Sequence, residues 1–339
     1  MDNRPASKTV VVIGMTAEEI RELEQAGPPQ TKIVSGLVTA PRPTNICPET
    51  AKTPGAHAAL IRQIAEADAL IGGPTQEMIQ AGKNLKWVQI LSAEVRPYLY
   101  PEMVGGDLVM TNLRGVAAPG VADHGVAMLL ALTRQLTRFI GNRNLERFER
   151  ERFGVLELKG MTAIVIGVGN IGLNVAQRLH GFEVNVIGVD VEDIPVTQWT
   201  SRVVTPDRLD EFLPRANMVF MCAPSTPLTD GMMGAKQFRL LPPGSYFIAV
   251  SRGSTYDMTA LVDALETGRL AGAAVDVTVP EPLPSGHPLW HYDNVIITYH
   301  CATESQMEMP RRLALVKENL TRFSAGRRLL NIVDKQKGY

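Results

Sequence analysis

The sequence Ile164-Val165-Ile166-Gly167-Val168-Gly169-Asn170-Ile171-Gly172 decides the fold class of this 339-residue chain. A run of β-branched residues leads into a GxGxxG motif, and apolar residues continue beyond it at helical spacing, as at Val175 and Leu179. Strand, glycine turn and helix in this order are typical of a dinucleotide-binding unit. The motif therefore predicts an α/β protein with a wound parallel sheet of the Rossmann type.

Each glycine of the motif has its own expected role. Gly167 permits the tight turn, Gly169 lets the backbone approach the pyrophosphate, and Gly172 allows close packing of helix on strand. Asn170 and Ile171 lie between the last two glycines, where unpaired N–H groups at the start of the helix meet the phosphates. We expect these five residues to bind the cofactor.

An acidic residue follows the next expected strand, Val184–Val189. Asp190 lies 18 residues past Gly172, close to the ~20 residues at which a ribose-binding acid is found. A carboxylate there accepts from both ribose hydroxyls and repels a 2′-phosphate, and Arg202 is the only nearby base. The sequence thus favours NAD over NADP.

Apolar runs alternate with helical patterns almost throughout the chain, as in parallel strands joined by crossover helices. In the first third the expected strands are Val10–Met15, Lys32–Val38, Ala69–Ile71, Trp87–Leu91 and Leu108–Thr111. The expected helices there are Glu18–Glu24, Ala56–Glu66 and Gln76–Ala81. Residues 41–54 carry four prolines and are expected to form a surface loop.

A second set of strands follows and completes a dinucleotide-binding sheet. Its six expected members are Ala163–Gly167, Val184–Val189, Met218–Cys222, Tyr246–Val250, Ala273–Val277 and Val295–Thr298. A helix over Val121–Ile140 is expected to connect the two sets, and a last helix over Gln306–Phe323 is expected to pack back on the first. The length also favours two domains, with a cleft between them.

Composition excludes several function classes. The 34 basic and 35 acidic residues leave a net charge of −1, so bulk charge indicates neither a nucleic acid nor a membrane partner. No apolar run approaches the ~18 residues of a membrane helix. The cysteines Cys47, Cys222 and Cys301 are far apart and lack CxxC spacing, so their pattern indicates neither disulfides nor a metal site. We expect a cytoplasmic protein.

Three ionisable residues come directly after expected strands, where a parallel sheet binds its ligands: Arg252, Glu281 and His300. Reduction of a 2-oxo acid needs a cation for the carboxylate, a proton donor beside the carbonyl oxygen, and a carboxylate that keeps the donor protonated. Taken singly, an arginine after a strand often forms a surface ion pair, and a glutamate between prolines is often an acidic residue of a turn. As an ordered set on a nucleotide-binding sheet, they favour catalysis.

These motifs together resemble the D-isomer-specific 2-hydroxyacid dehydrogenase family, and most of all its glyoxylate/hydroxypyruvate reductase-like branch. The resemblance runs from about Ala67 to Asn331. Besides the glycine loop, its matching segments are Asn84–Gln89, Thr111–Val116, Ala122–His124, Pro224–Thr229, Ser251–Gly253, Gly272–Val277, Glu281–Leu283 and Pro288–Trp290.

The resemblance implies a role for each matching residue. His300 would be the general acid in reduction, paired with Glu281, while Arg252 binds the substrate. Asp276 would hold the nicotinamide carboxamide, and Pro224 would line the cofactor cleft. His124, on the connecting helix, is expected to be structural or to lie at an interface. For Cys301, a buried inert thiol is favoured over a redox role.

The resemblance also implies the domain order and the assembly. Residues 1–113 with 302–339 would form a flavodoxin-like substrate domain, and residues 114–301 the NAD-binding Rossmann domain. The family habit is a homodimer formed through the cofactor domain. In such a dimer Trp290 would reach the partner's cleft, although a tryptophan is more commonly part of the hydrophobic core.

The segment Ser92–Arg96 departs from the family pattern. Relatives usually have Ser-Ala-Gly-Val here, whose backbone N–H groups clamp the substrate carboxylate, so Ala93, Glu94 and Val95 are candidate substrate residues. Glu94 stands in the place of the glycine and would add bulk and negative charge. It would then select a larger substrate with a cationic or hydroxyl group. Alternatively, Arg96 draws the carboxylate away and the clamp is the ordinary one.

Two other functions share this scaffold. A phosphite-type dehydrogenase keeps the same triad, whereas formate enzymes of this fold have glutamine in place of Glu281. A corepressor-like NAD sensor would use cofactor binding to control partner assembly. It usually carries a long disordered tail, whereas only the short segment Lys335–Tyr339 is expected to form a tail here.

Overall fold

The computed structural model describes residues 7–36, 54–146, 148 and 154–339. The chain divides into two compact units: unit 1 comprises Met1–Val116 and Gln306–Tyr339, and unit 2 comprises Ala117–Ser305. Each unit has its own parallel sheet. None of the described helices has the length and apolar composition needed to cross a membrane.

Unit 1 is built on a five-stranded parallel sheet with the order β2-β1-β3-β4-β5. Its strands are β1 (Lys8–Val12), β2 (Thr31–Ser35), β3 (Ala69–Ile71), β4 (Trp87–Gln89) and β5 (Val109–Thr111). This is the flavodoxin-like order 2-1-3-4-5. The expected fold of the first set of strands is therefore confirmed.

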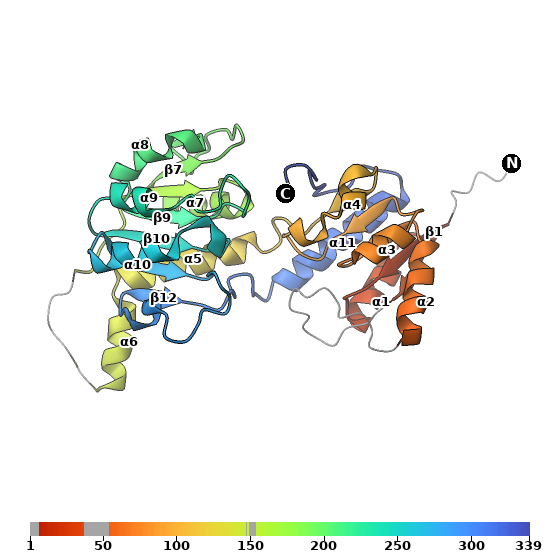
Figure 1. Ribbon diagram of the computed structural model, residues 1–339, viewed down its shortest axis with the longest axis horizontal. Coiled ribbons are helices and arrows are strands. Elements are labelled where there is room, and N and C mark those ends of the chain that lie inside the picture. The colour runs from red at the N-terminus through yellow and green to blue at the C-terminus, as the bar shows by residue number, and fades with distance from the viewer. Residues whose placement is uncertain (1–6, 37–53, 147, 149–153) are drawn as a thin grey trace. The chain divides into compact units, whose positions relative to one another are not determined.

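Helices cover both faces of this sheet, as a parallel sheet requires. They are α1 (Ala17–Ala26), α2 (Pro54–Ala65), α3 (Gln76–Ala81), α4 (Pro101–Gly105) and α11 (Glu308–Ser324), with the short helix η1 (Arg96–Tyr98). Helices α2, α3 and α4 pack on one face, and α1 and α11 on the other. In Figure 1 the blue helix α11 lies among the red and orange elements of unit 1, because the chain returns there at its C-terminal end.

Unit 2 carries a seven-stranded parallel sheet with the order β12-β11-β10-β9-β6-β7-β8. Its strands are β6 (Thr162–Ile166), β7 (Asn185–Val189), β8 (Arg202–Val204), β9 (Met218–Met221), β10 (Ser245–Ala249), β11 (Leu270–Val275) and β12 (Val295–Ile297). The order reverses between β6 and β9, which is the ligand-binding switch point of a Rossmann sheet.

The helices of unit 2 again cover both faces of its sheet. They are α5 (Ala118–Thr133), α6 (Leu136–Asn144), α7 (Asn170–Gly181), α8 (Leu209–Phe212), α9 (Ala235–Leu240) and α10 (Met258–Glu266). The short helices are η2 (Pro206–Arg208), η3 (Leu213–Arg215), η4 (Gly253–Thr255) and η5 (Pro288–His291). Helices α5 and α7 pack on one face, and α8, α9 and α10 on the other.

Two expectations about helices and strands were wrong. The connecting helix is broken into α5 and α6, because Gln135 takes the left-handed φ of 56° and the Thr133 carbonyl accepts from Leu156 N at 2.9 Å. The second sheet has seven strands rather than six, since the short edge strand β8 pairs with β7. Every expected strand overlaps an observed one. The proline-rich loop expected at residues 41–54 lies outside the described residues except for Pro54, which begins α2.

Candidate active site

The glycine loop joins β6 to α7 at the switch point. Gly167 has φ 88°, and a Cβ atom there would lie 2.5 Å from the backbone of Ala223. A Cβ atom on Gly172 would lie 2.0 Å from the Gly167 carbonyl oxygen. Only glycine fits these two positions, whereas nothing lies within 4 Å of the Cβ position of Gly169. The loop therefore leaves open space on one side, in front of the helix.

The start of α7 is suited to an anion. Gly169 is its N-cap and no side chain caps the first N–H groups, which belong to Asn170, Ile171 and Gly172. Unpaired N–H groups and the positive end of the helix dipole stabilise a phosphate placed there. The residues present thus fit a dinucleotide pyrophosphate.

Asp190 lies beside this loop, at the end of β7. Its Oδ2 accepts from Val168 N at 2.7 Å, inside the GxGxxG turn, and its Oδ1 accepts from Glu192 N at 3.0 Å. Pro224 follows β9 on the other side of β6 and is exposed, while its carbonyl accepts from Thr229 Oγ1 at 2.6 Å. The structure therefore places both predicted cofactor residues around the switch point.

Arg252 and Glu281 come from two loops that touch. Strands β10 and β11 are parallel neighbours, and Arg252 and Glu281 lie on the loops that follow them. A Cβ atom on Gly253 would lie 2.2 Å from the Thr278 carbonyl oxygen, so the residue after Arg252 packs directly on the second loop. Thr278 N in turn donates to Glu281 Oε1 at 2.9 Å. Arg252 itself donates from Nη1 to the Ser251 carbonyl at 2.7 Å.

Glu281 and His300 form a hydrogen-bonded pair. His300 Nδ1 and Glu281 Oε2 lie 2.9 Å apart, and the two side chains are 35% and 39% exposed. His300 follows β12, which is the neighbour of β11. Since a carboxylate oxygen only accepts, Nδ1 carries the shared proton and Nε2 is left as the nitrogen for other chemistry.

Asp276 holds the backbone around His300. His300 N donates to the Asp276 carbonyl at 2.8 Å, and its φ of 56° is uncommon for a residue with a side chain. The buried Asp276 carboxylate accepts from Cys301 N at 3.0 Å and from Ala302 N at 3.1 Å. These three bonds fix the turn and so determine where the histidine side chain begins.

Burial changes the acidity of two groups near these loops. The hydroxyl of Tyr256 donates to the Val277 carbonyl at 2.6 Å, and burial, with a further contribution from the Glu281 charge, raises its pKa. Burial and the Asp276 carboxylate raise the pKa of the Cys301 thiol, which is partly exposed rather than fully buried as expected. Both groups are therefore protonated near neutral pH.

The candidate substrate segment of unit 1 follows β4. Asn112 Nδ2 donates to the Ala93 carbonyl at 2.9 Å, and Leu113 N donates to the Ser92 carbonyl at 3.0 Å. Glu94 N donates to Ser92 Oγ at 3.1 Å, while the Val95 side chain is fully buried. The loop after β5 thus fixes the shape of this segment.

Glu94 is bonded within its own segment. Its Oε1 accepts from Arg96 N at 3.0 Å and lies 3.8 Å from Arg96 Nε. Glu94 is not among the described residues with positive φ, so the backbone itself does not demand glycine there. Arg96 thereby offsets the negative charge that Glu94 adds.

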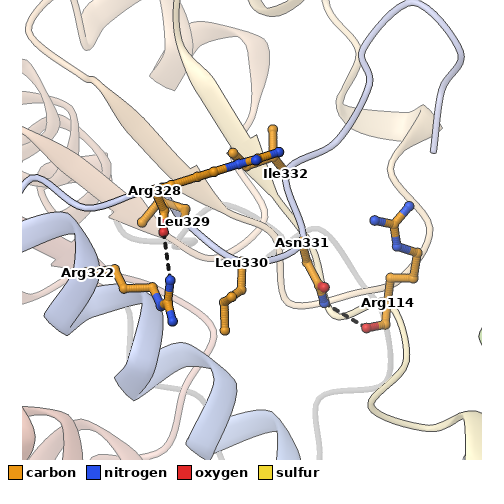
Figure 2. Close-up of a pocket in the computed structure, with 7 residues that line it drawn as sticks. All are labelled: Arg114, Arg322, Arg328, Leu329, Leu330, Asn331 and Ile332. Atoms are coloured by element: carbon orange, nitrogen blue, oxygen red, sulfur yellow. Dashed lines mark hydrogen bonds between the residues drawn. The ribbon is translucent and has the colours of Figure 1, made fainter.

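Unit 1 contains a pocket of about 360 Å³ that is lined by residues other than those predicted for the active site. Its lining residues are Arg114, Arg322, Arg328, Leu329, Leu330, Asn331 and Ile332 (Figure 2). Arg322 donates to the Arg328 carbonyl at 3.0 Å, and Asn331 Nδ2 donates to the Arg114 carbonyl at 2.7 Å. None of the residues predicted for the active site lines this pocket.

Two polar residues near the site were not assigned to it from sequence. Asn112, which holds Ala93, directly follows β5, and a polar residue at a strand end is the signal that could have found it. Thr298 donates to Asp276 Oδ1 at 2.5 Å and lies 3.0 Å from His124 Nε2. Its place two residues before His300 is the corresponding signal.

Comparison with known proteins identifies the family. Residues 126–302 match the NAD binding domain of the D-isomer specific 2-hydroxyacid dehydrogenases. A glyoxylate reductase from Thermofilum pendens is 31% identical over 300 residues, covering 85% of this chain and 87% of that protein. A D-3-phosphoglycerate dehydrogenase from Archaeoglobus fulgidus is 29% identical over 289 residues, covering 84% of this chain but only 54% of that longer protein.

A solved structure extends the likeness to both units. The D-isomer specific 2-hydroxyacid dehydrogenase from Xanthobacter autotrophicus Py2, in complex with NADPH and MES, has a TM-score of 0.79 and 25% identity. The match covers 98% of this chain and all of that one. With the glycine loop, the strand order and the match to the NAD binding domain, these likenesses show that the chain belongs to the D-isomer specific 2-hydroxyacid dehydrogenase family and is an oxidoreductase.

Proposed function

We propose that this protein transfers a hydride between NAD(H) and a small 2-oxo or D-2-hydroxy acid, with Arg252, Glu281 and His300 as its reacting groups. The observation that carries the proposal is the 2.9 Å pair of His300 Nδ1 and Glu281 Oε2, on loops after neighbouring strands. A histidine oriented by a carboxylate is suited to general acid–base catalysis.

Each residue has one task in this scheme. His300 gives a proton from Nε2 to the carbonyl oxygen during reduction, and takes it back during oxidation. Glu281 accepts the hydrogen bond from Nδ1–H and stabilises the charged imidazolium that takes part in the proton transfer. Arg252 binds the substrate carboxylate, for which its planar guanidinium is suited. The nicotinamide cofactor, when bound, supplies or receives the hydride.

The cofactor is assigned to the glycine loop of unit 2. Gly167, Gly169 and Gly172 leave room for the pyrophosphate at the start of α7, and Asp276 and Pro224 are assigned to the nicotinamide end. The position of Asp190 beside the loop supports NAD, because its carboxylate would repel a 2′-phosphate. The relative in complex with NADPH makes this preference a question for experiment.

In unit 1, we assign substrate binding to Ala93, Glu94 and Val95. Of the two readings of Glu94, the contacts with Arg96 support the one in which its carboxylate is held within the loop. The segment then accepts an unsubstituted 2-oxo acid. Selection of a cationic or hydroxylated substrate would instead require Glu94 to leave Arg96.

The test follows NADH absorbance with the purified protein and a panel of 2-oxo acids that includes glyoxylate, hydroxypyruvate and pyruvate. We expect reduction of at least one, and the Arg252→Lys variant should raise KM more than it lowers kcat. Phosphite with NAD is the control in the oxidative direction. Turnover of phosphite without turnover of any 2-oxo acid would overturn the proposal.

We further propose that the protein is a homodimer formed through unit 2. Helix α6 exposes apolar side chains that a monomer would leave in water, among them Leu136 (45%) and Ile140 (55%). Trp290 is 49% exposed, so it is not a core residue. Light scattering should give the mass of two chains, and Ile140→Glu should shift it toward one. The cytoplasmic location stays a prediction from cysteine usage.

A further inference from the structure

Three metal-ligating side chains that take no part in the proton transfer lie together in unit 2. His124 comes from α5, Asp276 from the end of β11, and Cys301 from the turn after β12. One imidazole nitrogen, one carboxylate oxygen and the thiol sulfur all lie within 4.8 Å of one another. His124 Nε2 and Asp276 Oδ1 are 3.7 Å apart.

The carboxylate of this cluster is buried and already oriented. The Asp276 side chain is 1% exposed, and its two oxygens accept three bonds, from Thr298 Oγ1, Cys301 N and Ala302 N. A carboxylate has about four acceptor positions, so one, on Oδ2, is left for a further partner. The His124 side chain is 24% exposed, which gives solvent ions a way in.

We propose that His124, Asp276 and Cys301 bind one transition-metal ion of the Zn²⁺ type, with a water molecule as the fourth ligand. A thiolate, an imidazole and a carboxylate suit Zn²⁺ or Co²⁺, whereas Mg²⁺ and Ca²⁺ prefer oxygen ligands alone. Bond lengths of ~2.0–2.3 Å place tetrahedral ligand atoms roughly 3.3–3.8 Å apart. Small side-chain rotations close the cluster to that size.

Binding of the ion is balanced by the loss of a proton. The Cys301 S–H proton goes to solvent as the thiolate–metal bond forms. The proton that His124 Nε2 donates to Thr298 Oγ1 exchanges through solvent to Nδ1, so the neutral ring binds the ion through Nε2. The ion replaces the present contact of His124 Nε2 with Thr298 Oγ1, 3.0 Å long. No oxidant or reductant is needed.

Such an ion would compete with the nicotinamide cofactor. This consequence depends on the proposed function, in which Asp276 holds the nicotinamide carboxamide. A carboxylate bonded to a metal ion has its remaining acceptor position occupied. By linkage, metal and NADH then weaken each other's binding by the same factor. The site would make the enzyme sensitive to zinc.

The direct test is titration of the metal-free full-length protein with Co²⁺, followed by absorbance. We expect one equivalent to produce a thiolate-to-cobalt charge-transfer band and the visible bands of a tetrahedral ion. Cys301→Ser should abolish the charge-transfer band. His124→Ala should weaken Co²⁺ binding by more than the roughly 10-fold that loss of an outer partner costs. Circular dichroism checks that each variant is folded.

The controls are the other two thiols. Cys222→Ala removes a buried thiol of the same unit, and Cys47→Ala removes one that lies outside the described residues. Both variants should keep the band. The proposal is overturned if wild type gives no band at excess Co²⁺, or if the band survives Cys301→Ser. It is equally overturned if the band is lost with Cys222 or Cys47.

A second measurement separates the metal site from the proposed role of Asp276. NADH binding is followed by fluorescence with and without Zn²⁺, in wild type and in Cys301→Ser. We expect Zn²⁺ to weaken NADH binding about 10-fold or more in wild type only, within the usual range of coupling between sites. Unchanged NADH affinity beside a clear cobalt band would support the metal site and contradict the carboxamide role of Asp276.

Discussion

Two carboxylates, Glu281 and Glu94, each pair with a basic side chain on a loop that follows a parallel strand. Glu281 pairs with His300, which is 19 residues away along the chain, at 2.9 Å. Glu94 pairs with Arg96, only two residues away, at 3.8 Å. The first pair joins loops from two neighbouring strands, and the second stays within one loop.

The difference lies in what holds each pair. Glu281 Oε1 also accepts from Thr278 N, and the His300 backbone is bonded to Asp276, so neighbouring strands determine the geometry of the pair. Glu94 also accepts a bond from Arg96 N, in the same segment. A pair held by the sheet keeps its orientation when the substrate comes and goes, whereas a local pair can rearrange at little cost. The four predictions below test this contrast.

The largest effect is expected from removal of the histidine. His300→Ala should slow the turnover of glyoxylate or another accepted substrate by roughly 10²–10⁴-fold, since the proton donor is lost. NADH binding, measured by fluorescence, should stay within about 2-fold because the glycine loop is unchanged. Wild-type turnover in this variant would remove His300 from the mechanism.

The next effect concerns the partner of the histidine. Glu281→Gln keeps the size of the side chain and one acceptor but loses the charge, and hydrogen bonds to charged groups are worth about 1.5–3 kcal/mol. We expect turnover at saturating substrate to fall about 10- to 100-fold.

A double-mutant cycle distinguishes orientation of His300 from general support of the fold. If Glu281 acts through His300, the double variant should be no slower than His300→Ala alone. Additive losses would show that Glu281 acts independently of the histidine.

Asp190 is a third carboxylate, and it accepts hydrogen bonds from the backbone N–H groups of Val168 and Glu192. Wild type should have a higher kcat/KM with NADH than with NADPH. Asp190→Ala should lower the ratio of these two kcat/KM values about 10-fold, because charge repulsion at a protein surface is worth about 1–4 kcal/mol. Asp193→Ala, which removes an exposed acid three residues away, is the matched control and should leave the ratio unchanged. A wild-type preference for NADPH would contradict the assignment of Asp190.

The smallest effect is expected at the local pair. Glu94→Gly should change kcat/KM for glyoxylate by less than about 3-fold, because Arg96 already holds the carboxylate. Arg96→Ala should lower it about 5-fold, since the freed charge repels a carboxylate by about 1 kcal/mol in water. Glu94→Gly combined with Arg96→Ala should restore the rate. A large gain from Glu94→Gly alone would show that Glu94 selects another substrate.

The sequence predicted the positions of eleven strands, but it missed a break in one helix and a short strand at the edge of a sheet. All eleven expected strands overlap observed ones, because alternating apolar runs and Gly167, Gly169 and Gly172 are local signals. The break between α5 and α6 was missed, because it depends on Leu156 taking the Thr133 carbonyl from outside the helix. The edge strand β8 was missed because three residues beginning with an arginine carry too short a pattern.

Part of the candidate site was visible in the order of residues. Arg252, Glu281 and His300 were recognisable because each follows an apolar run, and the family pattern gave them roles. The contacts of Arg96 with Glu94 and of Asn112 with Ala93 were not predictable as geometry, since rotamers and loop shape decide them. The position of His124 next to Asp276 was also missed, because 152 residues separate them in the chain.

By itself, the sequence of this protein determined the α/β class, the glycine turn and the residue types available for chemistry. These follow from local steric rules and from the periodicity with which apolar residues recur. Tertiary structure alone decided which strand ends became neighbours. The order β12-β11-β10 brings His300 to Glu281 and packs Gly253 on Thr278, and the packing of α5 brings His124 to Asp276. Such contacts depend on sheet order and helix packing, which form only when distant segments bury their apolar faces together.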